Sequence, residues 1–144
     1  MKLNNEENID FGIILSKNGL NKTSFRKKLI ELFYYSKSSL SIDEIINNLS
    51  HKVDKVSVYR ALSTFEENGL IHKVPDRNNL LRFALCQNEC SSVKHSNDHA
   101  HLLCSKCNAT FCLSNYKISI ENKYKDFIIN HSKIILEGSC IDCQ

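Results

Sequence analysis

The chain has 144 residues, of which 42% are hydrophobic and 24% are charged, and its formal net charge is +3. These values are ordinary for a globular protein with one or two small domains. No apolar stretch approaches the ~20 residues that cross a bilayer, so we expect no membrane partner. Residues 4–7 are polar where a secretory signal would be apolar, and we therefore expect a cytoplasmic protein whose thiols stay reduced.

Charge and cysteine content divide the chain near residue 86. Residues 1–85 hold 13 Lys and Arg against 10 Asp and Glu, whereas residues 86–144 hold 6 against 6. All seven cysteines lie in the second part, at positions 86, 90, 104, 107, 112, 140 and 143. The sequence therefore predicts a basic domain over residues 1–85 and a domain rich in metal ligands over residues 86–144.

The first domain is predicted to contain four helices followed by two strands. Helical periodicity covers residues 6–17, 23–35, a stretch that begins at residue 41, and 54–68. Ser41 opens a capping box with the sequence Ser-Ile-Asp-Glu, and Asp54 caps the fourth helix. After Gly69 the period changes to two, which predicts strands over residues 70–74 and 80–85. Residues 75–79 contain the turn between them.

Helices followed by a hairpin are the order of a winged helix-turn-helix, in which the last helix enters the DNA major groove. The outward face of the fourth helix carries cations, hydroxyls and one aromatic ring, which can contact phosphates and base edges. These side chains, with one cation in the turn of the hairpin, are the candidate DNA contacts: Lys55, Ser57, Tyr59, Arg60, Ser63 and Arg77. The alternative is the solvated face of a protein-binding module.

Two histidines precede the first pair of closely spaced cysteines. His99 and His101 alternate across one residue, so both imidazoles project from the same face of an extended strand and can share one ion. A histidine on its own at this position would more often be a surface residue. The pair therefore predicts a metal site.

Two Cys-x2-Cys pairs predict a structural zinc ion. Cys104 and Cys107 form the first pair, and Cys140 and Cys143 form the second. Each pair presents two thiolates from one turn, and two turns complete the tetrahedral sphere that Zn²⁺ prefers. Two disulfides or four inert thiols are the alternatives, and the expected reducing compartment disfavours the disulfides.

The segment from Asp54 to Leu62, Asp-Lys-Val-Ser-Val-Tyr-Arg-Ala-Leu, resembles the recognition helix of the ferric uptake regulator (Fur) family. Three further motifs agree with the family in order: Thr23-x2-Arg26, residues 66–71, and His99-x-His101-x2-Cys104-x2-Cys107. The resemblance spans about residues 10–143. It implies an α+β protein with an N-terminal winged helix-turn-helix and a small α/β dimerisation domain with strands over residues 102–103, 109–113 and 134–137.

The resemblance also implies a function. Members of the family are homodimeric repressors that bind an inverted repeat of double-stranded DNA, often at metal-uptake genes, when a regulatory metal is bound. No small-molecule substrate is implied. The family usually places a helix between Cys112 and Phe127, whereas Tyr116, Ile118 and Ile120 alternate like a strand, so the local pattern and the family conflict.

The zinc-sensing branch of the family implies a specific ligand set. In that branch a cysteine closes the wing and a ligand lies fourteen residues earlier, which here are Cys86 and His72. With His99 and His101 they supply three nitrogens and one sulfur, a set that favours Zn²⁺ over Fe²⁺. Ser38 and Ser39 lie about where iron-sensing and peroxide-sensing members often have a histidine.

This ligand set has a geometric difficulty and several competitors. If the hairpin is centred near Arg77 and Asn78, His72 lies opposite Phe83. Cys86 then lies three residues further along the strand than Phe83, a distance of about 10 Å. Cys90 and Cys112 compete for the same ion, and Cys86 and Cys90 can form a redox pair. Weaker candidates for a further site are His95, Asp98, Glu121 and His131.

Two alternative functions remain from the sequence. A thiol- or peroxide-responsive regulator of the same fold would use Cys86, Cys90 or Cys112. A zinc enzyme would need an open coordination position and a general base, and no glutamate lies within residues 99–107, so we expect no enzymatic activity.

Overall fold

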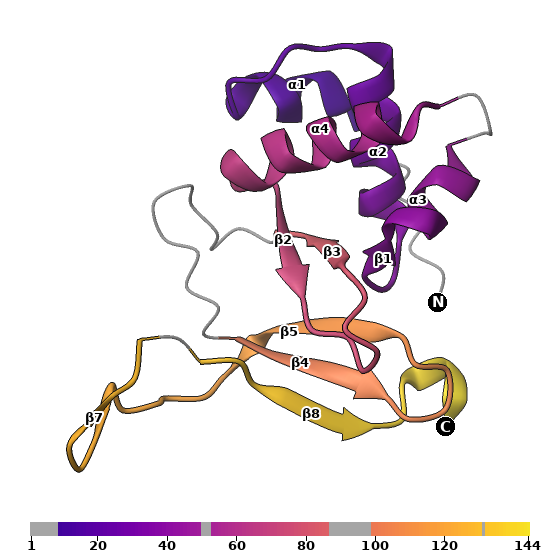
Figure 1. Ribbon diagram of the computed structural model, residues 1–144. Helices are drawn as coiled ribbons and strands as arrows, with labels where there is room; N and C mark the ends of the chain where they lie inside the picture. Colours follow the sequence, from indigo (N-terminus) through magenta and orange to yellow (C-terminus); the bar gives the residue numbers. More distant parts are fainter. Residues whose placement is uncertain (1–8, 50–52, 87–98, 131) are drawn as a thin grey trace.

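The computed structural model describes residues 9–49, 53–86, 99–130 and 132–144. Figure 1 shows four helices at one end of the molecule and a three-stranded sheet at the other, with a short hairpin between them. Within the described ranges, no helix has both the length and the apolar character that crossing a bilayer requires. The mixture of helices and small sheets confirms the predicted α+β class.

The four helices are α1 (Phe11–Lys17), α2 (Ser24–Tyr35), α3 (Ile42–Asn48) and α4 (Lys55–Glu67). Each begins after a residue whose side chain accepts a backbone N–H of the first turn: Asp10, Thr23, Ser41 and Asp54. The capping box at Ser41 is present as predicted. The predicted first helix begins at residue 6, and residues 6–8 lie outside the described residues. The observed helix begins at Phe11, because Asp10 is its N-cap and accepts the Gly12 N–H.

The helices pack around one apolar core. Leu29 and Ile30 of α2, Ile45 of α3, and Val58 and Phe65 of α4 are all completely buried. Replacing a buried Phe by Ala costs about 3–5 kcal/mol, so this core holds α4 firmly in place. The opposite side of α4 is left on the surface.

The first sheet has the strand order β1-β3-β2 and is antiparallel. β2 (Ile71–Val74) and β3 (Arg82–Leu85) are the predicted hairpin, and β1 (Leu40–Ser41) is a two-residue strand that periodicity does not detect. The expected register is wrong by one residue, because His72 lies opposite Ala84.

The loop of the hairpin explains the shifted register. The Asp76 carboxylate accepts the N–H groups of Asn78 and Leu80 at 2.9 and 3.4 Å, and Asn79 has a positive φ of 56°. These contacts build a wide turn that leaves Leu80 and Leu81 outside the strand.

The second sheet has the order β5-β4-β8. Its strands are β4 (His99–Cys104), β5 (Thr110–Lys117) and β8 (Ile135–Gly138), and they include the three strands expected from the family. β4 pairs antiparallel with β5 and parallel with β8. A 3₁₀ helix, η1 (Ile141–Cys143), follows β8.

A projecting hairpin occupies the place of the expected helix. β6 (Lys123–Tyr124) pairs with β7 (Phe127–Ile128) across a turn in which Lys125 has a φ of 51°. Among the described residues of the second half, η1 is the only helical element, and residues 113–126 contain the end of β5 and β6 where the family usually has a helix. The alternation of Tyr116, Ile118 and Ile120 indicated extended structure correctly up to Lys117, where β5 ends.

Candidate metal centres

Four cysteines converge at the end of the second sheet. Cys104 ends β4, and Cys107 lies in the turn that follows. Cys140 is the residue before η1, and Cys143 is the last residue of η1. Their sulfur atoms all lie within 4.8 Å of one another, and all four are thiols. The Sγ atoms of Cys107 and Cys140 are 3.8 Å apart, which equals the ~3.8 Å edge of a tetrahedron with Zn–S bonds of about 2.3 Å. The donor set and its geometry therefore fit Zn²⁺.

The surroundings of this cluster favour a bound cation. Backbone N–H groups of Cys107 and Cys140 lower the pKa of Cys104 to about 6. The neighbouring thiols of Cys140 and Cys107 raise the pKa of Cys143 to about 12. The Cys104 thiol therefore ionises readily. The Cys143 thiol ionises only when a bound cation offsets the effect of the neighbouring thiols.

A second cluster joins the two sheets. His72 of β2, His99 and His101 of β4, and Cys112 of β5 each offer a ligand atom, and these four atoms lie within 4.8 Å of one another. The ring centroids of His99 and His101 are 4.7 Å apart, and that of His72 lies 5.1 and 5.9 Å from them. Three of the four expected ligands are therefore brought together.

The fourth member of the cluster is Cys112, where the zinc-sensing resemblance implied Cys86. Cys112 lies directly opposite His101 in the pairing of β4 with β5. The sequence predicts Cys112 as a competitor for this ion, but a hairpin centred on the Cys104–Cys107 turn pairs residue 101 with residue 110. The observed register is centred one residue later and brings Cys112 opposite His101. Cys112 is therefore the candidate sulfur ligand of the cluster.

Cys86 lies on the other side of the His72 ring. Its sulfur is 3.3 Å from Nδ1, whereas the sulfur of Cys112 is 3.2 Å from Nε2. The expected distance of about 10 Å does not arise, because the shifted register and a hydrogen bond from the Cys86 N–H to the Leu70 carbonyl keep Cys86 beside β2. A histidine that binds metal through one ring nitrogen commonly forms a hydrogen bond through the other. Cys86 lies where it can be the hydrogen-bond partner of Nδ1 of His72.

His101 carries the strongest physical evidence that this cluster suits a metal ion. Only 4% of the residue is exposed, and neither ring nitrogen has a hydrogen-bond partner. Burial, and secondarily the charge of His99, lower the pKa of His101 to about 4. The ring is therefore neutral at pH 7 with a lone pair available, and each unsatisfied buried group costs about 1–3 kcal/mol unless something binds it.

Of the remaining metal candidates, the one in the described part of the chain does not join either cluster. Glu121 is exposed on the segment that leads into the projecting hairpin. Cys90, His95, Asp98 and His131 lie outside the described residues.

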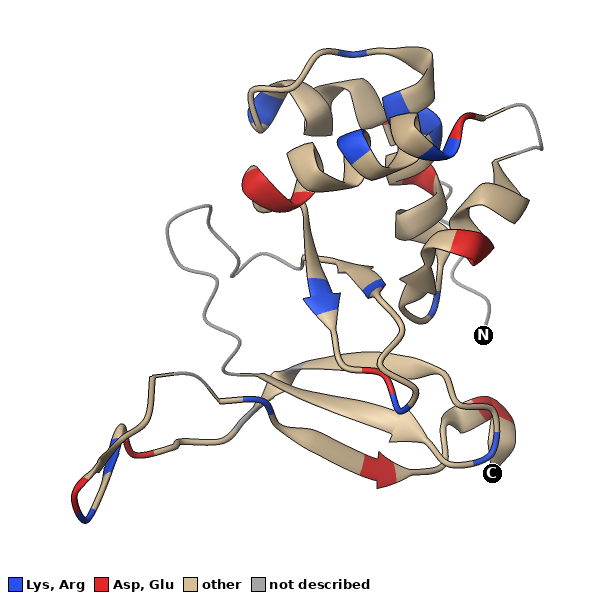
Figure 2. Cartoon of the chain, viewed as in Figure 1, with Lys and Arg blue, Asp and Glu red and all other residues tan. Residues whose placement is uncertain are grey.

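The candidate DNA contacts on α4 lie on one exposed face. Lys55, Ser57, Tyr59, Arg60 and Ser63 are all exposed, whereas Val58 between them is buried. Figure 2 shows Lys and Arg positions, in blue, on several of the helices. Arg77, the candidate in the hairpin loop, lies apart from this face. Its guanidinium lies 3.4 Å from the Glu137 carboxylate of β8, because the hairpin loop folds over the second sheet.

Comparisons with known proteins agree with this architecture. The sequence model of the ferric uptake regulator family matches residues 17–135. A peroxide-responsive repressor, PerR, of Staphylococcus saprophyticus is 23% identical over 137 residues, which cover 90% of this chain and 86% of the relative.

Solved structures show the same fold. The ferric uptake regulator of Vibrio cholerae, whose structure reveals a rearrangement of its DNA-binding domains, has a TM-score of 0.59 and 19% identity, covering 91% of this chain and 100% of that one. A zinc uptake regulator in complex with zinc and DNA has a TM-score of 0.59 and 18% identity, covering 90% of this chain and 87% of that one.

Proposed function

Since the chain belongs to the ferric uptake regulator family of metal-responsive transcriptional regulators, we propose that it is a homodimeric DNA-binding repressor controlled by a metal between its two domains. The observation that carries this proposal is the cluster of His72, His99, His101 and Cys112, which draws ligands from the winged helix and from the second sheet. We place the domain boundary near residue 86, between these two units. The expected reduced thiols agree with a cytoplasmic location.

Zn²⁺ is the regulatory metal that the donor set favours. Three imidazole nitrogens and one thiolate are softer than the nitrogen and oxygen ligands that suit Fe²⁺. The buried, neutral ring of His101 supports the same assignment, because it offers an uncharged lone pair at physiological pH. Cys86 would hold His72 in the tautomer that presents Nε2 to the ion.

The four-cysteine cluster would have a different role. All its ligands come from residues 104–143, so an ion there would hold the second sheet and η1 together without linking the domains. Structural zinc of this kind contributes about 10–16 kcal/mol, as much as the whole stability of a domain.

The regulatory ion would act by fixing the orientation of the winged helix. When the ion is absent, few contacts join the two units, and the arrangement that fits DNA is a minor population. When the ion binds, the exposed faces of two α4 helices in a dimer would lie one helical turn, about 34–36 Å, apart on an inverted repeat. A change of 10²–10³ in DNA affinity needs about 3–4 kcal/mol of coupling.

His101→Ala tests the proposal most directly. This variant should keep the four-cysteine zinc and the dimer, and should lose the increase in DNA affinity on addition of Zn²⁺. Operator binding of parent and variant is measured across a titration of free Zn²⁺, and again with Fe²⁺. A variant that responds to Zn²⁺ like the parent would exclude the cluster as the sensor, and a parent that responds only to Fe²⁺ would reassign the metal.

A peroxide-responsive regulator is the second candidate. The position of His72 between two thiols, and the similarity to PerR, favour this candidate over a zinc enzyme. It predicts that DNA is released on treatment with peroxide while free Zn²⁺ is held constant. No enzymatic activity is proposed.

A further inference from the structure

The contact between the two domains has a second part that contains no metal ligand. Thr110, the first residue of β5, is only 1% exposed and holds two separate segments of the winged helix. Its carbonyl accepts the Ser39 N–H at 2.9 Å. Its hydroxyl donates to the Pro75 carbonyl at 3.1 Å. One residue of the second sheet therefore fixes the segment before β1 and the segment after β2.

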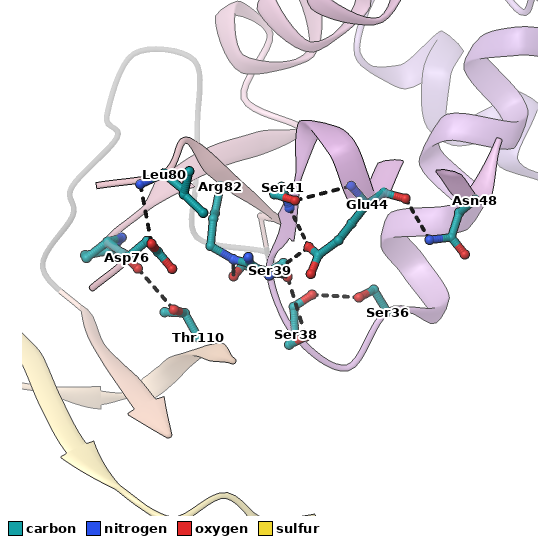
Figure 3. A network of polar contacts seen from close by, with 11 residues as sticks. Ser36, Ser38, Ser39, Ser41, Glu44, Asn48, Asp76, Leu80, Arg82 and Thr110 are labelled. Carbon is teal, nitrogen blue, oxygen red and sulfur yellow. Dashed lines mark hydrogen bonds and ion pairs between the residues drawn. The ribbon is translucent and has the colours of Figure 1, made fainter. Parts of the chain in front are cut away.

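Ser39 is held rigidly within the winged helix. Figure 3 shows the network in which Arg82 donates from Nε to the Ser39 hydroxyl at 3.0 Å and from Nη2 to the Ser39 carbonyl at 2.8 Å. Ser39 and Arg82 are 1% and 8% exposed, so these bonds are shielded from water. The Ser39 N–H is thus a fixed donor.

The same network reaches α3. Arg82 Nη2 also lies 2.8 Å from the Glu44 carboxylate, whose Oε2 accepts the Ser41 N–H at 2.7 Å. Glu44 and Ser41 form the capping box at the start of α3, the helix that precedes α4. The position of Thr110 is therefore linked by continuous hydrogen bonds to the helix-turn-helix.

We propose that Thr110 is a positioning residue that holds the winged helix on the second sheet independently of the regulatory metal. Cys112 lies two residues further along β5, about 7 Å at the usual strand rise, so Thr110 and the metal cluster close the same junction at neighbouring points. The effect of Thr110 on the junction rests on the contacts above. Its effect on DNA binding rests on the proposed function.

The size of the effect follows from the bonds. Removing the hydroxyl breaks one partly buried hydrogen bond and leaves the Pro75 carbonyl without this donor, which lowers the closed population by about 3- to 10-fold. The apparent dissociation constant for Zn²⁺ equals the intrinsic constant of the closed arrangement divided by the fraction of molecules that are closed. When that fraction falls, the Zn²⁺ concentration for half-maximal DNA binding rises by the same factor. The ligand set itself is unchanged.

Hydrogen exchange of the Ser39 amide in zinc-loaded full-length protein tests the proposal. Thr110→Val removes the donor at constant shape, and Thr110→Ser keeps it. We expect the Ser39 amide to exchange about 3- to 10-fold faster in Thr110→Val and at the parent rate in Thr110→Ser. The amide of Ile30 in the helical core should be unchanged, which distinguishes an opened junction from general loss of stability. Thr110→Ala should agree with Thr110→Val.

The Zn²⁺ titration of DNA binding supplies the second readout. In Thr110→Val the midpoint should rise about 3- to 10-fold, with the parent midpoint restored in Thr110→Ser. An unchanged Ser39 exchange rate in both Thr110→Val and Thr110→Ala overturns the proposal whatever the DNA result. If the parent itself ignores Zn²⁺, the proposed function fails, and the exchange rates still decide the role of Thr110.

Discussion

Replacing Cys112 by serine, in comparison with Cys86→Ser, should show which of these two thiols binds the regulatory metal and which contacts His72 from outside the metal site. A four-ligand zinc site of about 10–16 kcal/mol assigns about 2.5–4 kcal/mol to each ligand, so loss of the thiolate should weaken Zn²⁺ binding by about 10²–10³-fold. Cys86→Ser is the matched control, because the Cys86 sulfur lies against Nδ1 of His72, whereas the Cys112 sulfur lies against Nε2. Serine keeps a hydrogen-bond acceptor there, and the expected loss is about 10-fold.

Competition with a chelator of known affinity measures both losses at the regulatory site while the four-cysteine zinc stays bound. Cobalt substitution gives an independent reading, because sulfur-to-cobalt absorption should disappear in Cys112→Ser and persist in Cys86→Ser. The reverse order, with Cys86→Ser losing more affinity and the sulfur absorption, would refute the ligand set drawn from the geometry. The set implied by the family resemblance, with Cys86 as the ligand, would then be correct.

Three further predictions concern the structural zinc, the DNA contacts and His101. Cys104→Ser should release the structural zinc and unfold the second sheet, and a soluble zinc-free dimer detected by mass analysis would contradict this. Tyr59→Ala and Arg60→Ala should each weaken operator binding by about 1–3 kcal/mol with unchanged melting, whereas Arg77→Ala should bind DNA like the parent. Without the regulatory metal, His101 lowers stability as pH falls from 6.5 to about 4, because only the unfolded chain takes up the proton in that range. The loss reaches about 3 kcal/mol, and denaturant unfolding at several pH values should show a smaller slope in His101→Gln.

Local chemistry explains which parts of the fold could be predicted from the sequence. The caps at Ser41 and Asp54 act within one turn of their own helix, so the starts of α3 and α4 could be read from neighbouring residues. The same holds for the two Cys-x2-Cys pairs, whose spacing alone suggests zinc. Each of these signals needs no information about distant parts of the chain.

The errors concern contacts between distant residues. The register of the β2–β3 hairpin depends on how Asp76 folds its loop, and the one-residue shift altered the expected position of Cys86. Cys112 entered the cluster through strand pairing, and Arg77 turned toward Glu137 because the loop packs on another sheet. The spacing of apolar residues in the sequence gives no information on such packing, which depends on the tertiary structure.

The pairing of β4 has a consequence for the order in which the protein assembles. β5 follows β4 after a short turn, so these two strands can pair early, and His101 and Cys112 then face each other. β8 pairs with β4 in parallel only after residues 105–134 have been looped out, and such non-local pairing is slow. During synthesis on the ribosome, His72, His99, His101 and Cys112 all emerge before Cys140. The nascent chain would therefore bind its first ion at the junction between the two domains. At that stage the four-cysteine site, which holds its ion more firmly in the finished protein, is not yet complete.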